Sequence, residues 1–365
     1  MKNLSPGNID FLGVGNKCNL NCRQSCYFVE QKSLPTIEKA DDFFIMKKII
    51  SQFPKAAFFA YPKEITTSMN ISQIFPITKQ THVLSNGILL NEEKIDCLKA
   101  AGITKVKITL FANFRDHSLF YNINESQYEI IKNNISLCKN RGLLVTVNNI
   151  ISQPTKNSIA ELVALGSDLG VDKIRFIRLQ PMGNGQNADL SLFITENDMP
   201  DIILAIEKCK QQYPSVHLGY TISFGPNFYL KTREEATEKI RLSQRDWTKS
   251  KYLCPAINGD YLGISMKTGT LYHCFWAMSD PEFVAGRMDL STGKIIERRD
   301  TALSAEILRE KLRGNCHKDN CKYQDLCLGG CRCAAYAFAK MRGEVDPLFA
   351  GMDICITKSQ EKILG

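Results

Sequence analysis

Long hydrophobic runs are missing from this sequence of 365 residues. No stretch of about 18 uncharged apolar residues occurs, so the sequence predicts no transmembrane helix and no membrane partner. The first 15 residues, MKNLSPGNIDFLGVG, lack the apolar core of a secretory signal peptide. We therefore expect a cytoplasmic protein.

Extended basic runs, internal repeats and low-complexity tracts are also absent. The formal net charge is +8, which by itself would indicate nucleic acid as a partner. Because no basic run accompanies that charge, the sequence does not favour a nucleic acid. With 44% hydrophobic and 23% charged residues, the chain can bury a large core and form two domains.

Cysteine, in contrast, is abundant. The sequence has 14 cysteines, which in a reducing compartment indicates metal binding or catalysis rather than structural disulfides. Three of them lie within nine residues near the N-terminus, and eight lie from Cys254 to Cys355. The other three, Cys97, Cys138 and Cys209, fall in helical patterns beside apolar residues, where we expect buried structural thiols.

Short β-rich apolar runs alternate with helical patterns from residue 9 to about residue 214. This alternation is typical of βα units around a parallel sheet. The expected strands cover residues 10–14, 56–61, 81–85, 105–111, 143–151 and 173–179, and the expected helices include 36–53, 91–102, 125–142 and 157–170. The predicted fold class is α/β, a partial (β/α)6 barrel whose functional residues follow the strands.

Composition divides the chain into three parts. We expect the partial barrel over residues 1–215, a linking region over 216–250 that ends in a charged helix, and a small cysteine-rich domain over 251–365. Glycine and cysteine become frequent in the third part. Such a composition is typical of a domain held together by metal ligation more than by a hydrophobic core.

The first cysteine group, GNKCNLNCRQSCYF, places Cys18, Cys22 and Cys26 in the loop after the first expected strand. A cubane iron-sulfur cluster needs a ligand on each of four irons, so three thiolates leave one iron open. The segment resembles the radical S-adenosylmethionine (SAM) superfamily, whose usual spacing is Cys-x3-Cys-x2-Cys. Here the second gap is one residue longer. A three-cysteine zinc site is the alternative.

The resemblance implies that SAM binds the open iron through its amino and carboxylate groups. One-electron reduction then releases a 5'-deoxyadenosyl radical, a reaction that belongs to the cofactor while the protein positions it. The resemblance also implies SAM contacts after the later strands. The candidates are Glu64, Ser85, Asn86, Thr109 and Arg178.

These candidates match the family's elements to different degrees. Glu64, in YPKE, stands where the family has a Gly-Gly-Glu element that binds the SAM amine, and a surface glutamate is the alternative. Ser85 and Asn86 correspond to a Thr-Asn-Gly element that contacts the ribose or the methionine part of SAM. Thr109 ends the fourth strand. Arg178 is placed to pair with the SAM carboxylate, and a structural ion pair is its alternative.

The second cysteine group has a recognisable order. It reads Cys254, Gly269-x4-Cys274, Cys316-x4-Cys321-x5-Cys327-x3-Cys331, Cys333 and Cys355. This order resembles the SPASM domain of radical SAM enzymes, except that the interval between Cys316 and Cys321 is two residues longer. The segment CLGGCRCAAYAFAKMRGEVDP is most similar to the enzymes that cross-link a precursor peptide in pyrroloquinoline quinone biosynthesis.

The SPASM resemblance implies two auxiliary 4Fe-4S clusters, and hence three clusters in all. Cluster I would use Cys254, Cys274, Cys331 and Cys333. Cluster II would use Cys316, Cys321, Cys327 and Cys355. Clusters with four thiolates suit electron transfer or scaffolding, because no iron is left for a substrate. Two structural zinc sites fit the same spacing.

The resemblance implies a radical SAM oxidoreductase that matures a ribosomally made peptide through an oxidative cross-link, formed between two carbon atoms. The expected partners are the precursor peptide, a separate recognition protein and a flavodoxin- or ferredoxin-type reductant. No catalytic acid or base is identified. The alternatives are a sulfatase-maturating enzyme, which Phe275 disfavours because that family has an aspartate there, a small-molecule alcohol dehydrogenase, and a non-catalytic iron-sulfur electron carrier.

Overall fold

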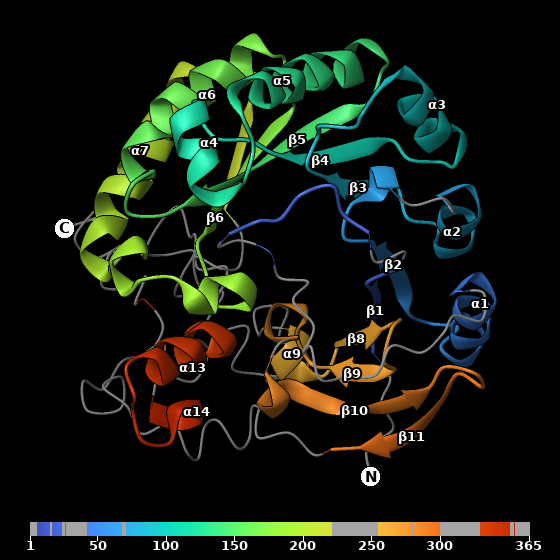
Figure 1. Ribbon diagram of the computed structural model, residues 1–365. Helices are drawn as coiled ribbons and strands as arrows, with labels where there is room; N and C mark the ends of the chain where they lie inside the picture. The colour runs from blue at the N-terminus through green and yellow to red at the C-terminus, as the bar shows by residue number, and fades with distance from the viewer. Residues whose placement is uncertain are drawn as a thin grey trace, which may run out of the picture.

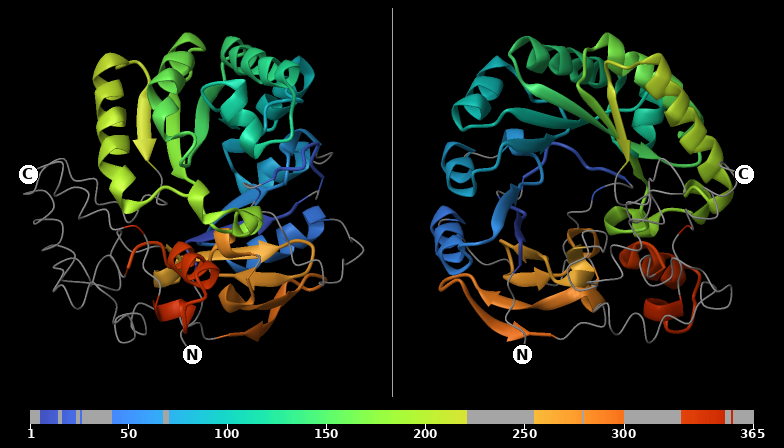
Figure 2. Two further views of the ribbon diagram at one scale, coloured as in Figure 1. Left: turned by 60° about the vertical axis from the view of Figure 1, so that its left-hand side comes forward. Right: turned by 180° about the vertical axis from the view of Figure 1, so that it is seen from behind.

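Two β-sheets form the framework of the protein (Figure 1). The computed structural model describes residues 6–14, 17–23, 26, 42–67, 71–220, 255–278, 280–299, 329–350 and 354. One sheet has five strands in the order β3-β4-β5-β6-β7, and the other has six in the order β11-β10-β9-β8-β1-β2. The two sheets face each other across the interior of an incomplete barrel (Figure 2).

The five-stranded sheet is parallel throughout. Its strands are β3 (His82–Ser85), β4 (Lys105–Thr109), β5 (Leu144–Ile151), β6 (Lys173–Arg178) and β7 (His217–Tyr220). Helices cover its outer face (Figure 1). The helices of this half are α2 (Ile71–Thr78), α3 (Glu92–Ala100), α4 (Phe114–Phe120), α5 (Glu125–Asn140), α6 (Ile159–Asp168) and α7 (Met199–Gln212).

The six-stranded sheet joins two N-terminal strands to four strands from residues 261–298. Its strands are β1 (Asn8–Leu12), β2 (Ala57–Tyr61), β8 (Tyr261–Ser265), β9 (Thr270–Tyr272), β10 (Val284–Asp289) and β11 (Lys294–Arg298). β1 pairs in parallel with both β2 and β8, although β8 follows it by about 250 residues. The remaining helices are α1 (Asp42–Gln52), α9 (Pro255–Asn258), α13 (Arg332–Met341) and α14 (Pro347–Ala350).

The predicted α/β class and all six predicted strands are confirmed, with ends shifted by a few residues. The structure adds a seventh parallel strand, β7, inside the expected linking region. It also shows that the cysteine-rich part is not separate from the barrel, because β8 extends the sheet of β1 and β2. The expected charged helix at the end of the linking region lies outside the described residues.

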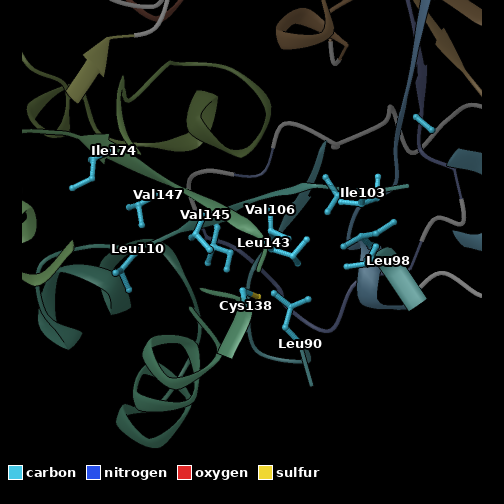
Figure 3. Close-up of a cluster of buried hydrophobic side chains, with 14 of the residues drawn as sticks. Leu90, Leu98, Ile103, Val106, Leu110, Cys138, Leu143, Val145, Val147 and Ile174 are labelled. Atoms are coloured by element: carbon cyan, nitrogen blue, oxygen red, sulfur yellow. The ribbon is translucent and has the colours of Figure 1, made fainter. Parts of the chain in front are cut away.

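The main core lies between the five-stranded sheet and its helices (Figure 3). Val106, Val145 and Ile174 point outward from the sheet and meet Leu98 and Cys138 from the helices. In a strand, successive side chains point to opposite faces. The residues between these core positions therefore face the interior of the barrel, which is where a ligand would bind.

The three scattered cysteines differ in burial. Cys138 and Cys209 are buried in the main core, as expected for structural thiols. Cys97 is exposed on α3, so the expectation was wrong there, because its helix buries Ile95 and Leu98 instead. No helix in the described part of the chain is long and apolar enough to cross a membrane.

Candidate active site

A cavity of about 880 Å³ lies inside the partial barrel. Side chains from both sheets line it, at the edge where the parallel strands end. The cysteines of the first group and the polar candidates after the second, third and fourth strands share this cavity. They are Cys18, Cys22, Cys26, Glu64, Ser85, Asn86 and Thr109. The structure thus brings together the sequence-predicted barrel residues, with the exception of Arg178.

The cysteine loop is fixed at its ends by side chains that follow other strands. Asn184, in the turn after β6, donates from Nδ2 to the carbonyl oxygen of Cys22 at 2.6 Å and from its backbone N to that of Cys26 at 3.0 Å. Asn86 donates to Asn19 Oδ1 at 2.8 Å. These contacts tie the backbone at Cys22 and at Cys26 to the turn after β6.

Glu64 is buried, with 2% of its surface exposed, so the alternative of a surface glutamate is excluded. Its Oε1 accepts from Thr66 N at 3.1 Å, from Thr66 Oγ1 at 2.7 Å and from Ser85 Oγ at 2.8 Å. Its Oε2 accepts from Asn86 N at 2.7 Å. Each carboxylate oxygen offers about two lone pairs, so Oε2 keeps one acceptor position for a ligand.

The polar side chains after β3 and on β4 and β5 differ in whether they already hydrogen-bond within the protein. Ser85 Oγ donates to Glu64 and accepts from Gly87 N, so it is engaged within the protein. Thr109 lines the cavity and its hydroxyl makes no hydrogen bond among the described residues. Asn148, which the sequence analysis missed, also lines the cavity, and its buried Oδ1 has no partner there either.

Arg178 ends β6 and is buried, with 1% of its surface exposed, but it is not part of the cavity lining. The β6 residues that do line the cavity are Arg175 and Ile177. Successive side chains on a strand point to opposite faces. Arg178 therefore shares the outer face of β6 with Ile174 and Phe176, which belong to the main core, and does not point into the cavity. Contact between Arg178 and SAM stays a prediction.

Comparisons with known proteins agree with this geometry. No protein-family model matches the sequence. The AdoMet-dependent heme synthase of Methanosarcina barkeri is 25% identical over 262 residues, which are 69% of either chain. The structure of Streptococcus suis SuiB bound to precursor peptide SuiA superposes with a TM-score of 0.67 at 12% identity, over 96% of this chain and 76% of SuiB.

A second solved structure, native anSMEcpe with bound AdoMet, superposes with a TM-score of 0.65 at 13% identity. It covers 98% of this chain and 96% of anSMEcpe. The matching fold and the sequence relative thus indicate the same family as the three cysteines after the first strand. The chain is similar to radical SAM enzymes in sequence and in fold.

Cys18, Cys22 and Cys26 remain the predicted ligands of an open cubane cluster, and all three line the cavity. Burial is the main cause that raises the pKa of the Cys22 thiol to about 12, and the nearby Cys26 and Cys18 contribute to this shift. A bound iron deprotonates such thiols outright. Among the described residues, no group of three or more His, Cys, Asp or Glu side chains could hold a single metal ion.

The described cysteines of the predicted auxiliary cluster I also come together. Cys274 follows β9, Cys331 caps α13 and Cys333 lies in its first turn. All three pack in one small hydrophobic cluster with Met182 and Phe283. The other predicted auxiliary ligands, Cys254, Cys316, Cys321, Cys327 and Cys355, lie outside the described residues.

The glycine of the Gly-x4-Cys element has a clear structural reason. Gly269 has φ +69°, and a Cβ there would lie 2.1 Å from the carbonyl oxygen of Met288 on β10. Only glycine tolerates both the positive φ and the close approach. The tight turn directs β9 and the following Cys274 toward α13.

Glu64→Gln is expected to weaken SAM binding by about 10- to 100-fold, the effect of losing a charge-assisted hydrogen bond in a buried site. The glutamine side chain can still accept through its oxygen, but its amide group donates where Asn86 N or Ser85 Oγ also donates. Isothermal titration calorimetry of the reconstituted protein with SAM measures the effect.

Iron content is the first control for Glu64→Gln, because the variant must keep the iron-sulfur cluster that the cysteine loop is predicted to bind. Glu93→Gln is a matched variant, since Glu93 is exposed in the first turn of α3 and lies outside the cavity. Unchanged SAM affinity in Glu64→Gln would show that Glu64 serves only to join the ends of β2 and β3.

Proposed function

We propose that this protein is a radical SAM enzyme that matures a ribosomally made peptide by taking a hydrogen atom from it and forming an oxidative cross-link between two carbon atoms. The observation that carries the proposal is the position of the cavity. Cys18, Cys22 and Cys26 line it together with Phe275 and Trp276, which directly follow Cys274. A substrate there lies near both the proposed radical site and a predicted auxiliary ligand.

When bound, an open cluster with SAM supplies a carbon radical able to take a hydrogen atom from a substrate. The chain supplies the enclosure for that chemistry. Phe59, Tyr61, Phe275 and Trp276 form an aromatic part of the cavity wall. Such a wall limits the access of water to a reactive substrate.

A hydrophobic cluster connects the two cysteine groups. Its buried members include Phe111 and Phe120 from the barrel and Phe338 from α13, and both Cys22 and Cys331 pack against it. A substrate radical must lose one electron to give a closed-shell product, and fully ligated clusters suit electron transfer. Because the same group of hydrophobic side chains contacts both cysteine groups, it supports a protein with three 4Fe-4S clusters and an oxidative reaction.

The structural relatives support a peptide as the substrate. SuiB is seen with its precursor peptide SuiA, and anSMEcpe is seen with AdoMet and the Cp18Cys peptide. We propose the same substrate class here, presented by a separate recognition protein, with a flavodoxin or ferredoxin as the reductant.

Two enzymatic alternatives differ in their support. Phe275 lines the cavity directly after Cys274, so no carboxylate is available there for sulfatase maturation. Oxidation of a small molecule is favoured by one observation, the sequence similarity to a protein named as a heme synthase. That relative makes small-molecule chemistry the second candidate.

Coexpression with the short open reading frames that flank the gene tests the proposal. We expect one encoded peptide to lose the mass of two hydrogens and to resist fragmentation between the linked residues in tandem mass spectrometry. We also expect the purified protein, once reconstituted anaerobically and reduced, to cleave SAM and to yield the same product from the peptide.

The control for this experiment is the protein with alanine at Cys18, Cys22 and Cys26, which must leave every peptide unchanged. SAM cleavage that alters no peptide but oxidises an added alcohol or tetrapyrrole would establish the small-molecule alternative. A loaded and reduced protein that cleaves no SAM would be an electron carrier, and the proposal would be wrong.

A further inference from the structure

Cationic side chains line the inner face of the five-stranded sheet. Lys107 on β4 and Arg175 on β6 line the cavity. Lys105 and Lys173 precede them by two residues and therefore share their faces of the strands. Four cations thus project from two strands toward the barrel interior.

The strand register places these groups close to one another. Thr146 on β5 pairs with Lys107 on one side and with Lys173 on the other, and Asn148 pairs with Arg175. Adjacent strands lie about 4.8 Å apart, and Lys107 and Arg175 lie on either side of β5, offset by two residues along it. This separation is within reach of the two long side chains and a carboxylate between them. The site is therefore built on three neighbouring strands rather than on loops.

Neither Lys107 nor Arg175 has an ion-pair or hydrogen-bond partner among the described residues. Burial is the main cause that lowers the pKa of Lys107 to about 8, and the nearby Arg175, Lys105 and Lys173 contribute to this shift. Burial also lowers the pKa of Arg175. Burying unpaired cations destabilises a protein, and such groups in a cavity are typical of a binding site.

The acidic groups that face the cavity do not balance these cations. Glu64 lies at the rim and already accepts four hydrogen bonds. Asp10 on β1 accepts from Tyr261 at 2.9 Å, and burial raises its pKa to about 7. Lys63 and Lys267 also line the cavity, so its interior carries a positive field.

One histidine borders the same region. Burial is the main cause that lowers the pKa of His82 to about 4, and the nearby Lys107, Lys105 and Arg175 contribute to this shift. His82 is therefore neutral at physiological pH and adds no charge of its own. Its depressed pKa reports the same positive field that an incoming anion would meet.

We propose that Lys107 and Arg175 bind a carboxylate on the peptide substrate, the side chain of a glutamate or aspartate close to the residue that reacts. This inference rests on the proposed function and names the substrate that the cavity selects. An arginine presents a planar fork that matches a carboxylate, and a lysine adds a compact charge.

Only one of the two cations lies deeper in the barrel than the candidate SAM contact Thr109. Lys107 precedes Thr109 by two residues on β4 and so lies about 7 Å deeper, whereas Arg175 is level with Thr109 because both pair with Asn148. A carboxylate held by both cations therefore lies beside and below Thr109, in the same cavity as Cys18, Cys22 and Cys26. The methionine carboxylate of SAM offers the same chemistry, so the test must distinguish the two sources.

Two pentapeptides that differ at one position provide the probe, acetyl-Gly-Gly-Glu-Gly-Gly-amide and its glutamine counterpart. Calorimetry with the SAM-loaded holoprotein is expected to show about tenfold or stronger preference for the glutamate peptide. Lys107→Met and Arg175→Met are each expected to reduce this preference toward equality. SAM affinity is expected to stay within about twofold of the wild-type value in both variants.

Lys294→Met is the matched control, because it removes one positive charge from an exposed position on β11 and should keep the preference. Lys107→Met should remain folded and melt at a higher temperature, since it removes a partly buried charge without a partner. That stabilisation excludes unfolding as the cause of lost binding.

Two results would overturn the inference. One is equal binding of the two peptides by the wild-type holoprotein. The other is a fall in SAM affinity in Lys107→Met and Arg175→Met with the peptide preference retained, which would assign the cations to the SAM carboxylate. Binding needs no radical chemistry, so either result leaves SAM cleavage and peptide maturation to be judged by their own assays.

Discussion

Alanine at Cys18, Cys22 and Cys26 together is expected to remove about a third of the bound iron and to abolish reductive SAM cleavage. The reconstituted wild-type protein should hold on the order of 12 irons, four in each of three cubane clusters. The three thiols line the cavity and are the predicted ligands of one of these clusters. Iron analysis and chromatography of 5'-deoxyadenosine measure the two effects.

Only about a third of the iron should be lost, because the predicted ligands of the auxiliary clusters lie elsewhere in the protein. Cys274, Cys331 and Cys333 pack in a separate hydrophobic cluster, so their metal should remain. Cys97→Ala is the matched control, because it removes an exposed thiol on α3. Zinc in place of iron, or SAM cleavage by the triple variant, would contradict the assignment.

Periodicity predicted the barrel because its strands and helices are local patterns. Alternating apolar runs and helices ending before glycine are visible in the sequence, and Gly142 and Gly170 have positive φ after α5 and α6 as expected. β7 was missed because a strand of four residues, HLGY, is too short to show an alternation of apolar and polar side chains. The pairing of β8 with β1 was missed because nothing local indicates a partner 250 residues away.

The cluster ligands stay a prediction, which rests on thiolate spacing as the chemical signal. The surroundings of Glu64 could not, since its burial depends on Thr66, Ser85 and Asn86 meeting it from two strand ends. The role of Asn184 was hidden for a similar reason. It binds backbone carbonyl oxygens of the cysteine loop, and such partners leave no mark in a sequence.

Two polar residues on the strands could have been found from the sequence. Strand alternation, applied from the apolar Ile174 and Phe176, assigns Arg175 to the inner face and separates it from Arg178. The same period assigns Asn148 to the inner face of a strand otherwise rich in valine and isoleucine. A polar residue in such a strand indicates a ligand or a polar interior.

Replacing Cys331 and Cys333 together with alanine is expected to spare part of the SAM cleavage and to abolish the cross-linked peptide. The two cysteines begin α13 and are predicted ligands of auxiliary cluster I, which leaves the radical-generating cysteines untouched. Without a path for the substrate electron, an oxidative cross-link cannot be completed. Uncoupled 5'-deoxyadenosine should then accumulate, with the iron content reduced by about a third.

Folding is the first concern in this variant, because Cys333 is buried beside Met182, Phe283 and Tyr336. Cys138→Ala is the matched control for removing a buried sulfur, since it lies in the barrel core far from the auxiliary ligands. Iron retained at the N-terminal cluster, seen as continued SAM cleavage, shows that the barrel is intact. If the double variant still forms the cross-link at normal yield, the electron leaves by another route, and the role assigned to the auxiliary cluster is wrong.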